Sequence, residues 1–207
     1  MGKKNKEIYL IGAGGHAKVI IALLDELGMS SPAIYDDAER LQGTKFCGIP
    51  IAGPVSALPD RGDVSAVIAI GVNETRRRIS SAFKNVSWAA LVHPHSWVHA
   101  SVSIGRGSVV FAGSVIQPGS VIGAHTIVNT SVSIDHDCRV GDFCHIAPGC
   151  HIAGGVRIGD NVFCGIGSCV AQYISVCGDI VIGAGAAVTR DLTEPGVYVG
   201  LPAKRRA

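Results

Sequence analysis

The chain has 207 residues, of which 47% are hydrophobic but only 16% charged and 5% aromatic, so it can bury a substantial core of small aliphatic side chains. Its 27 glycines favour many tight turns over ordinary helical packing. The net charge is +2, and we interpret the basic runs at the two ends, residues 3–6 and 204–206, as solvated ends, so we see no electrostatic footprint for nucleic acid.

Residues 8–11 form the first apolar run, which we interpret as a strand. The run is too short for a signal sequence or a membrane span, so we expect a cytoplasmic protein without membrane association. It enters the glycine-rich segment G-A-G-G-H-A at residues 12–17. Residues 18–27 then show an aliphatic helical pattern that closes at Gly28.

A second strand is predicted over residues 33–35, and it ends in Asp36 and Asp37. A third strand over residues 64–70 ends in G-V-N and precedes a charged helix over residues 74–83. The order strand, glycine-rich turn, helix and strand with a carboxyl-terminal acid indicates a right-handed parallel βαβ arrangement.

The glycine-rich turn and the acid pair together predict a nucleotide site in this front domain, which we assign to residues 1–92. Glycines let backbone N–H groups approach a phosphate, and an acid about 20 residues on can accept hydrogen bonds from ribose hydroxyls. The segment is only half of a full dinucleotide-binding sheet, so a mononucleotide or nucleotide sugar fits better than NAD. A plain tight turn and a solvated acidic loop are the alternative interpretations.

Aliphatic residues recur at every sixth position through the second half of the chain. A period of six is typical of a parallel β-helix, in which each hexapeptide forms one side of a triangular coil. Fifteen of the sixteen positions in the run are Ile or Val: Val98, Ile104, Val110, Ile116, Ile122, Val128, Ile134, Val140, Ile146, Ile152, Ile158, Cys164, Val170, Val176, Ile182 and Val188.

The repeat predicts five coils over residues 98–187, within a left-handed β-helix domain at residues 93–207 that the chain leaves through residues 193–196. Each repeated aliphatic residue should point inward and stack on its equivalent 18 residues later. One corner of each coil is expected to use a glycine with φ > 0. These glycines are Gly105, Gly123, Gly141 and Gly159.

The seven cysteines have no paired short spacing, and we expect them to be reduced. Cys138, Cys144 and Cys150 invite a metal-site interpretation until the repeat is applied, because all three occupy the fifth position of a hexapeptide. Other fifth positions hold small or slender residues as well. We therefore expect the three thiols to fill the core and expect no metal.

His136 is the candidate general base of the β-helix domain. Acyl transfer from a thioester to an amine or hydroxyl needs a base near neutral pH, and a neutral His beside a carboxylate meets that need. The segment I-D-H-D-C at residues 134–138 supplies acids on both sides, Asp135 and Asp137. His145, near a corner, could meet the thioester carbonyl, and Asn129 could hydrogen-bond an acceptor group; we assign no chemistry to the histidines at 93, 95 and 99.

Five segments carry a family resemblance over nearly the whole chain. They are I-G-A-G-G-H-A at 11–17, the acid pair at 36–37, I-A-I-G-V-N at 68–73, N-T-S-V-S-I-D-H-D-C at 129–138 and V-G-L-P-A-K at 199–204. With these segments the chain resembles the hexapeptide-repeat sugar acetyltransferases of the NeuD and PglD type, which acetylate sialic acid or the 4-amino group of a UDP-linked bacillosamine precursor.

The resemblance implies an acetyl-CoA-dependent acetyltransferase in which His136 is the general base, Asp137 raises its basicity, and the acceptor attacks the thioester directly. It places the co-substrate acetyl-CoA between neighbouring β-helices of a homotrimer. The implied acetyl-CoA contacts are His145, Ile166 and Ala184, the last two through backbone. The implied nucleotide-sugar contacts are Gly15, His16, Ala17, Asp36, Asp37 and Gly71, to which we add Asn129.

We therefore expect N-acetylation of a nucleotide-linked sugar of the UDP-4-amino type. O-acetylation of a sialic acid is the alternative, although a free sugar gives the glycine-rich turn nothing to hold. A metal-dependent hydratase of the γ-carbonic-anhydrase type uses the same helix, but the residues 18 positions before and after His136 are Pro118 and Gly154, so no histidine ladder forms. A non-catalytic nucleotide-sugar-binding scaffold is the remaining alternative.

Overall fold

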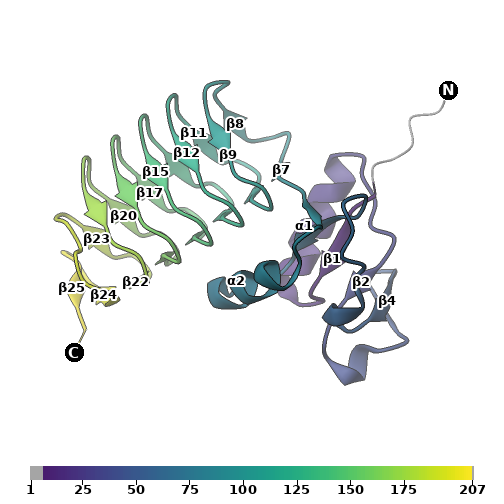
Figure 1. Ribbon diagram of the computed structural model, residues 1–207. Coiled ribbons are helices and arrows are strands. Elements are labelled where there is room, and N and C mark those ends of the chain that lie inside the picture. Colours follow the sequence, from purple (N-terminus) through teal and green to yellow (C-terminus); the bar gives the residue numbers. More distant parts are fainter. Residues whose placement is uncertain (1–6, 207) are drawn as a thin grey trace. The chain divides into compact units, whose positions relative to one another are not determined.

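The structure is a computed structural model that describes residues 7–206, and the basic run at residues 3–6 lies outside them. The chain divides into two compact units, Met1–Ala89 and Ala90–Ala207 (Figure 1). Among the described residues, no helix is both long enough and apolar enough to cross a membrane.

The first unit is a six-stranded sheet with α1 (Gly15–Glu26) and α2 (Asn73–Ala82). All its strand pairs are parallel except the β3–β4 hairpin, and the predicted βαβ arrangement is confirmed. The sequence analysis missed β3, β4 and β6. In sheet order the strands are β3 (Lys45–Phe46), β4 (Ile49–Gly53), β2 (Ile34–Tyr35), β1 (Tyr9–Ile11), β5 (Ser65–Ile68) and β6 (Ser87–Trp88); short 3₁₀ turns lie at Glu39–Leu41 and Val55–Ala57.

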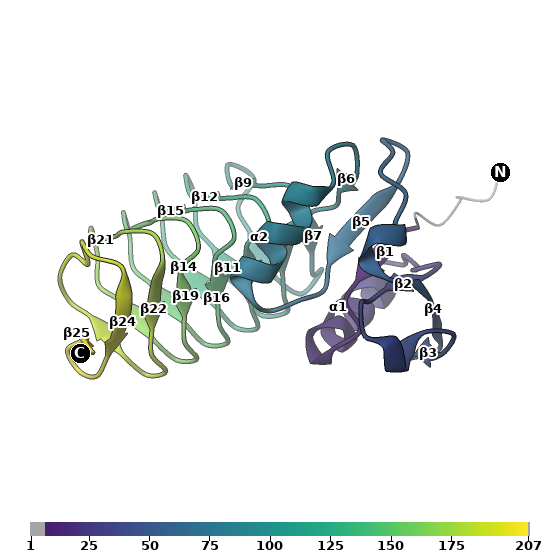
Figure 2. The same cartoon turned by 60° about the horizontal axis from the view of Figure 1, so that its bottom comes forward.

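The second unit is a triangular β-helix whose coils stack along one axis (Figures 1 and 2). The first face contains β7 (Leu91–Val92), β10 (Val109–Val110), β13 (Ile127–Val128), β16 (His145–Ile146), β19 (Phe163–Cys164), β22 (Ile180–Ile182), β24 (Gly196–Val199) and β25 (Lys204–Arg205). The second contains β8 (Trp97–Val98), β11 (Val115–Ile116), β14 (Ser133–Ile134), β17 (His151–Ile152), β20 (Cys169–Val170) and β23 (Ala187–Val188). The third contains β9 (Ser103–Ile104), β12 (Val121–Ile122), β15 (Arg139–Val140), β18 (Arg157–Ile158) and β21 (Ser175–Val176).

The aliphatic ladders follow the predicted register. Ile116 pairs with Ile134, and Ile134 pairs with Ile152, so that each residue stacks on its equivalent in the next coil. These side chains are buried and form one continuous core. The predicted fold class, an α/β domain followed by a left-handed parallel β-helix, is confirmed.

The predicted number of five coils is too low. The second face alone has six strands, and the first face begins earlier, at β7, than the repeat at Val98 suggested. The chain also does not leave the helix at residues 193–196, because β24 continues the first face in parallel with β22 and β25 then returns antiparallel to it. The carboxyl-terminal strands escaped prediction because they depart from the six-residue period, whereas Val92 keeps the period, pairs with Val110 and was overlooked.

The predicted reason for the recurring glycines is wrong. Gly105, Gly123, Gly141 and Gly159 do not have positive φ; a Cβ on Gly123 would instead lie 2.4 Å from the backbone carbon of Gly141 in the next coil. Close approach of neighbouring backbones therefore excludes a side chain there. Positive φ occurs two residues later, at residues such as Gly107 and His125.

The fifth-position residues do more than fill space. Ser120 Oγ donates to the Asp135 carbonyl at 2.7 Å, and Cys138 Sγ donates in the same way to Ala153 at 3.1 Å, each across 15 residues. Cys138, Cys144 and Cys150 are fully buried as predicted, and burial raises the pKa of the Cys138 thiol. Each thiol thus satisfies a corner carbonyl from within the core.

Candidate active site

His136 lies at the corner between β14 and β15, with its side chain 51% exposed. Its Nδ1 is 2.9 Å from Asp137 Oδ2, and its backbone N–H donates to Asp135 Oδ1 at 2.8 Å. Asp137 has φ 59°, a left-handed conformation that Asp tolerates and that turns its carboxylate back to the imidazole. When Nδ1 carries the proton toward Asp137, Nε2 is left as the basic atom.

The electrostatics of this corner favour the protonated imidazole. The hydrogen bond to Asp137 raises the pKa of His136 above its ordinary value of 6.5, partial desolvation opposes this rise, and the charges of Asp135 and Asp137 add to it. Because both partners are exposed, solvent screens the pair and the interaction contributes little to folding. The pair therefore fixes the orientation of the imidazole rather than stabilising the fold.

Gly154, one coil further along, is a neighbour of His136 that the sequence analysis did not single out. A Cβ at this glycine would lie 2.6 Å from His136 Nε2, so the imidazole rests on the bare backbone of Gly154. The sequence contains a signal for this contact, because Gly154 stands 18 residues after His136 and therefore lies beside it in the next coil. The sequence analysis used this spacing only to exclude a histidine ladder.

Asn129 and His145 form a second polar pair, on the first face. Asn129 Oδ1 accepts the Thr130 N–H at 2.8 Å, which directs Nδ2 to His145 Nε2 at 3.1 Å. His145 Nε2 is therefore the acceptor, and its proton lies on Nδ1. His145 begins the two-residue strand β16, directly after a corner, and packs edge-on against Phe163.

A single chain does not bring the two pairs together. His136 lies at the corner shared by the second and third faces, whereas His145 lies on the first face, which is opposite that corner of the triangle. Ile166 and Ala184 lie at the corners that follow β19 and β22, between the first and second faces, and both are exposed. The predicted base therefore lies on a different side of the helix from the predicted acetyl-CoA residues.

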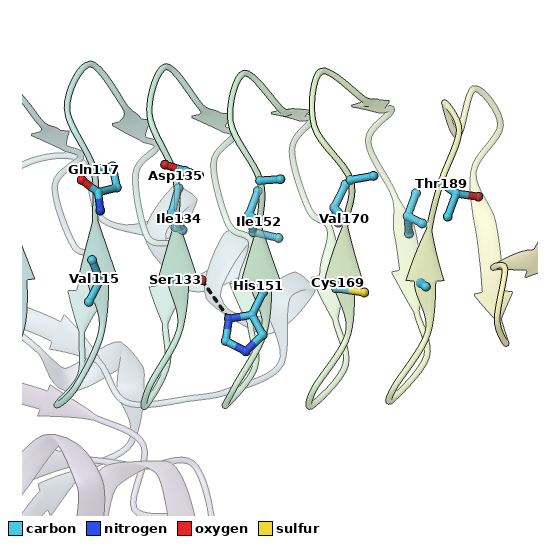
Figure 3. Close-up of a pocket in the computed structure, with 14 residues that line it drawn as sticks. Val115, Gln117, Ser133, Ile134, Asp135, His151, Ile152, Cys169, Val170 and Thr189 are labelled. Atoms are coloured by element: carbon cyan, nitrogen blue, oxygen red, sulfur yellow. Dashed lines mark hydrogen bonds between the residues drawn. The ribbon is translucent and has the colours of Figure 1, made fainter.

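A groove of about 440 Å³ runs along the outside of the second face (Figure 3). Val115, Ser133, His151 and Cys169 form one row of its lining, and Ser133 Oγ lies 2.8 Å from His151 Nδ1. Asp135, next to His136, lines its edge. None of the predicted site residues lines this groove.

In the first unit, Asp36 is bonded to the glycine-rich turn. Its Oδ2 accepts the Ala13 N–H at 2.7 Å and its Oδ1 accepts the Ala38 N–H at 2.8 Å. Asp37 is exposed, and its Oδ1 accepts the Val55 N–H at 2.8 Å. The two carboxylates therefore hold the backbone of the loop at the carboxyl end of β2.

The glycines of the turn fall into two classes. Gly12 has φ +100°, and a Cβ there would lie 2.6 Å from Ile70, so the fold itself requires glycine. A Cβ on Gly14 or Gly15 would meet nothing within 4 Å. These two leave open space at the N-terminus of α1, whose first turn contains no acidic residue; His16 and Ala17 follow in the same turn.

Arg76 is the other residue that the sequence analysis missed. Its side chain is 1% exposed, and its guanidinium donates to the carbonyls of Ile70 and Gly71 and to Asn73 Oδ1. These bonds hold the loop after β5, which includes the predicted substrate residue Gly71. Within residues 7–206, no three His, Cys, Asp or Glu side chains gather as metal ligands.

Comparison with known proteins identifies the family. A profile of the PglD N-terminal domain matches residues 7–83. The acetyltransferase domain of PglB from Neisseria gonorrhoeae is 36% identical, with a TM-score of 0.89 over 98% of this chain and 100% of that one. The chain belongs to the PglD-type hexapeptide acetyltransferase family.

Other members of the PglD-type family have been solved with ligands. PerB from Caulobacter crescentus, in complex with CoA and GDP-perosamine, is 35% identical, with a TM-score of 0.90 over 98% of both chains. UDP-N-acetylbacillosamine N-acetyltransferase of Bacillus subtilis is 31% identical over 52% of this chain and 52% of its own length. The match therefore spans about half the length of this curated relative.

Proposed function

We propose that the protein is an acetyl-CoA-dependent N-acetyltransferase that acts on the amino group of a nucleotide-linked sugar. The observation that carries the proposal is the His136–Asp137 pair, which presents a basic Nε2 at an exposed corner. Support comes from relatives that are solved with CoA and GDP-perosamine or that act on a UDP-linked amino sugar by name.

In the proposed reaction, the amine lone pair attacks the thioester carbonyl carbon, the C–S bond breaks and the CoA thiolate leaves. His136 Nε2 accepts the proton that the nitrogen loses and can return it to the thiolate, while Asp137 stabilises the imidazolium formed in between. The raised pKa suits this role, since a base is most effective when its pKa lies near the working pH.

The acyl donor is proposed to bind between two copies of the chain. His136 and the Asn129–His145 pair lie on opposite sides of one triangular coil, so a donor that meets both must lie between a corner of one β-helix and the first face of another. A homotrimer closes this head-to-tail contact. His145 of one chain would then lie beside the thioester in the partner's site, with Ile166 and Ala184 further along the donor.

The first unit is proposed to hold the nucleotide. Open space over Gly14 and Gly15 and the absence of acids in the first turn of α1 suit a diphosphate at the helix N-terminus. His16, Ala17 and Gly71 would border the same site, and the acids at 36 and 37 would face the ribose. The panel of UDP- and GDP-linked sugars in the test below distinguishes uracil from guanine as the base.

The test is thiol release from acetyl-CoA by wild type and His136→Ala, with a panel of UDP- and GDP-linked amino sugars and free sialic acid. Release that requires a nucleotide amino sugar and falls at least about 100-fold in the variant is the expected result. Release with sialic acid alone would replace the proposal with O-acetylation. If acetyl-CoA binds but none of the acceptors in the panel causes thiol release, the proposed acceptor class is contradicted.

A further inference from the structure

Tyr173 is an exposed aromatic residue at a corner where the fold imposes a left-handed backbone conformation. Its side chain is 74% exposed, and its φ of 60° places a bulky residue in the left-handed region. Equivalent corner positions in earlier coils hold Gly119, Asp137 and Gly155, which tolerate this conformation. Phe143 shares the conformation, but its ring stacks on His125 at 5.3 Å.

Tyr173 lies on the same corner as His136, two coils further along. Its ring leans back over Gly155, where a Cβ would lie 2.5 Å from Cδ1. The His136 imidazole leans forward over Gly154, the preceding residue. The two side chains therefore border the bare Gly154–Gly155 backbone from opposite sides, and about 10 Å of coil stacking separates their own backbones.

We propose that Tyr173 is a donor-binding residue, whose ring packs against the part of acetyl-CoA that lies just beyond the thioester. This inference rests on the proposed function. An apolar ring at the edge of a bare glycine surface, next to the atom that takes the proton, suits contact with a bound chain. A bulky, mostly exposed residue held in a left-handed conformation is the kind that persists at ligand sites.

The direction in which the proposed donor residues extend along the helix favours acetyl-CoA, rather than the acceptor, as the molecule that Tyr173 contacts. The proposed donor residues His145, Ile166 and Ala184 lie in successive coils toward the carboxyl-terminal end of the helix. Tyr173 lies in that direction from His136, and it belongs to the same coil as Ile166, one corner later.

The test compares Tyr173→Gly and Tyr173→Phe with wild type by thiol release and by the thermal shift that acetyl-CoA alone induces. Glycine suits the left-handed position, so the first variant should fold. We expect Tyr173→Gly to raise the KM for acetyl-CoA about tenfold, the effect of losing contact with part of one aromatic ring. The thermal shift induced by acetyl-CoA should become smaller. The KM for the acceptor should stay unchanged, and Tyr173→Phe should resemble wild type.

Asn161→Gly is the matched control, because Asn161 has φ 59° at a different corner and its replacement should leave both KM values unchanged. A rise in the acceptor KM instead of the donor KM, or no change in either, overturns the inference. If wild type releases no thiol with any acceptor, the proposed reaction fails, yet unequal acetyl-CoA binding by wild type and Tyr173→Gly still supports the contact. Absence of acetyl-CoA binding to wild type overturns both.

Discussion

The imidazole of His136 lies on the backbone of Gly154, so that a methyl group on Gly154 would come within 2.6 Å of Nε2. Gly154 does not have positive φ, and Gly154→Ala therefore introduces no backbone strain. We expect the methyl group to displace the imidazole and lower kcat at least about tenfold, since misplacement of a base by an ångström weakens proton transfer strongly.

The free energy of unfolding should change by less than about 1 kcal/mol in Gly154→Ala, because His136 is exposed and can move away. Gln172→Ala, at the equivalent exposed position one coil further on, is the control and should keep wild-type kcat. Wild-type activity in Gly154→Ala, measured by thiol release, would show that the His136 position is not used in the reaction.

Asp137→Asn tests the electrostatics of the corner. His136 must be neutral to act as a base, so kcat/KM should fall as the pH drops through a pKa above 6.5. Asn removes the charge that favours the imidazolium, which lowers this pKa and moves the acid limb to lower pH. The plateau at high pH should fall as well, because Nδ1 loses its oriented partner.

The measurement for Asp137→Asn is kcat/KM from about pH 5 to 9 at low and high salt. In the wild type, added salt should also lower the pKa of the acid limb, because the pair is exposed and screened. An acid limb that stays in place in Asp137→Asn would assign it to another group.

Gly15→Ala tests the proposed phosphate site without threatening the fold. Gly15 is the first residue of α1, and its Cβ would meet nothing within 4 Å, so stability should stay equal or rise by up to about 1 kcal/mol. The methyl group would, however, occupy the space in which a phosphate approaches the backbone. We expect a rise of at least about tenfold in the acceptor KM.

The KM for acetyl-CoA should not change in Gly15→Ala, and thermal unfolding provides the stability measurement. An unchanged acceptor KM together with unchanged stability would place the nucleotide elsewhere. Gly12→Ala is the contrasting variant: it should unfold at lower temperature, because Gly12 has φ +100° and faces Ile70.

Mixed oligomers test whether the site is shared between chains. His136→Ala and His145→Ala should each be nearly inactive as pure oligomers. If the base and the donor residue come from different chains, a 1:1 mixture that is unfolded and refolded together should regain about a quarter of the wild-type activity per site. No recovery, with oligomers of normal mass by light scattering, would require both residues to act from one chain.

The six-residue period determined most of the β-helix from the sequence. Ile134 and Ile152 could be paired across 18 residues because each strand of the helix repeats its neighbour's register. The nucleotide-like turn of the first unit was likewise visible, because its glycines and Asp36 stand at the spacing that a βαβ crossover imposes. Periodic and local patterns of this kind survive in the sequence.

Contacts between neighbouring coils were harder to predict from the sequence. The role of Gly105 and its equivalents was misassigned because a glycine alone does not tell whether dihedral freedom or close approach is needed. Strands β24 and β25 lie outside the period, so only the completed structure revealed them. Arg76 was missed because a charged residue in a polar helix gives no sign that its guanidinium is buried against loop carbonyls.

The sequence by itself determined the repeat and the buried ladders, and it predicted His136 as the base, since these depend on residue type and spacing. Only the tertiary structure decided that Gly154 supports the imidazole and that His145 faces away from His136 on the opposite face of the coil. The reason is geometric. A period specifies which residues stack, but the direction of each corner side chain depends on backbone dihedrals and on neighbours one coil away.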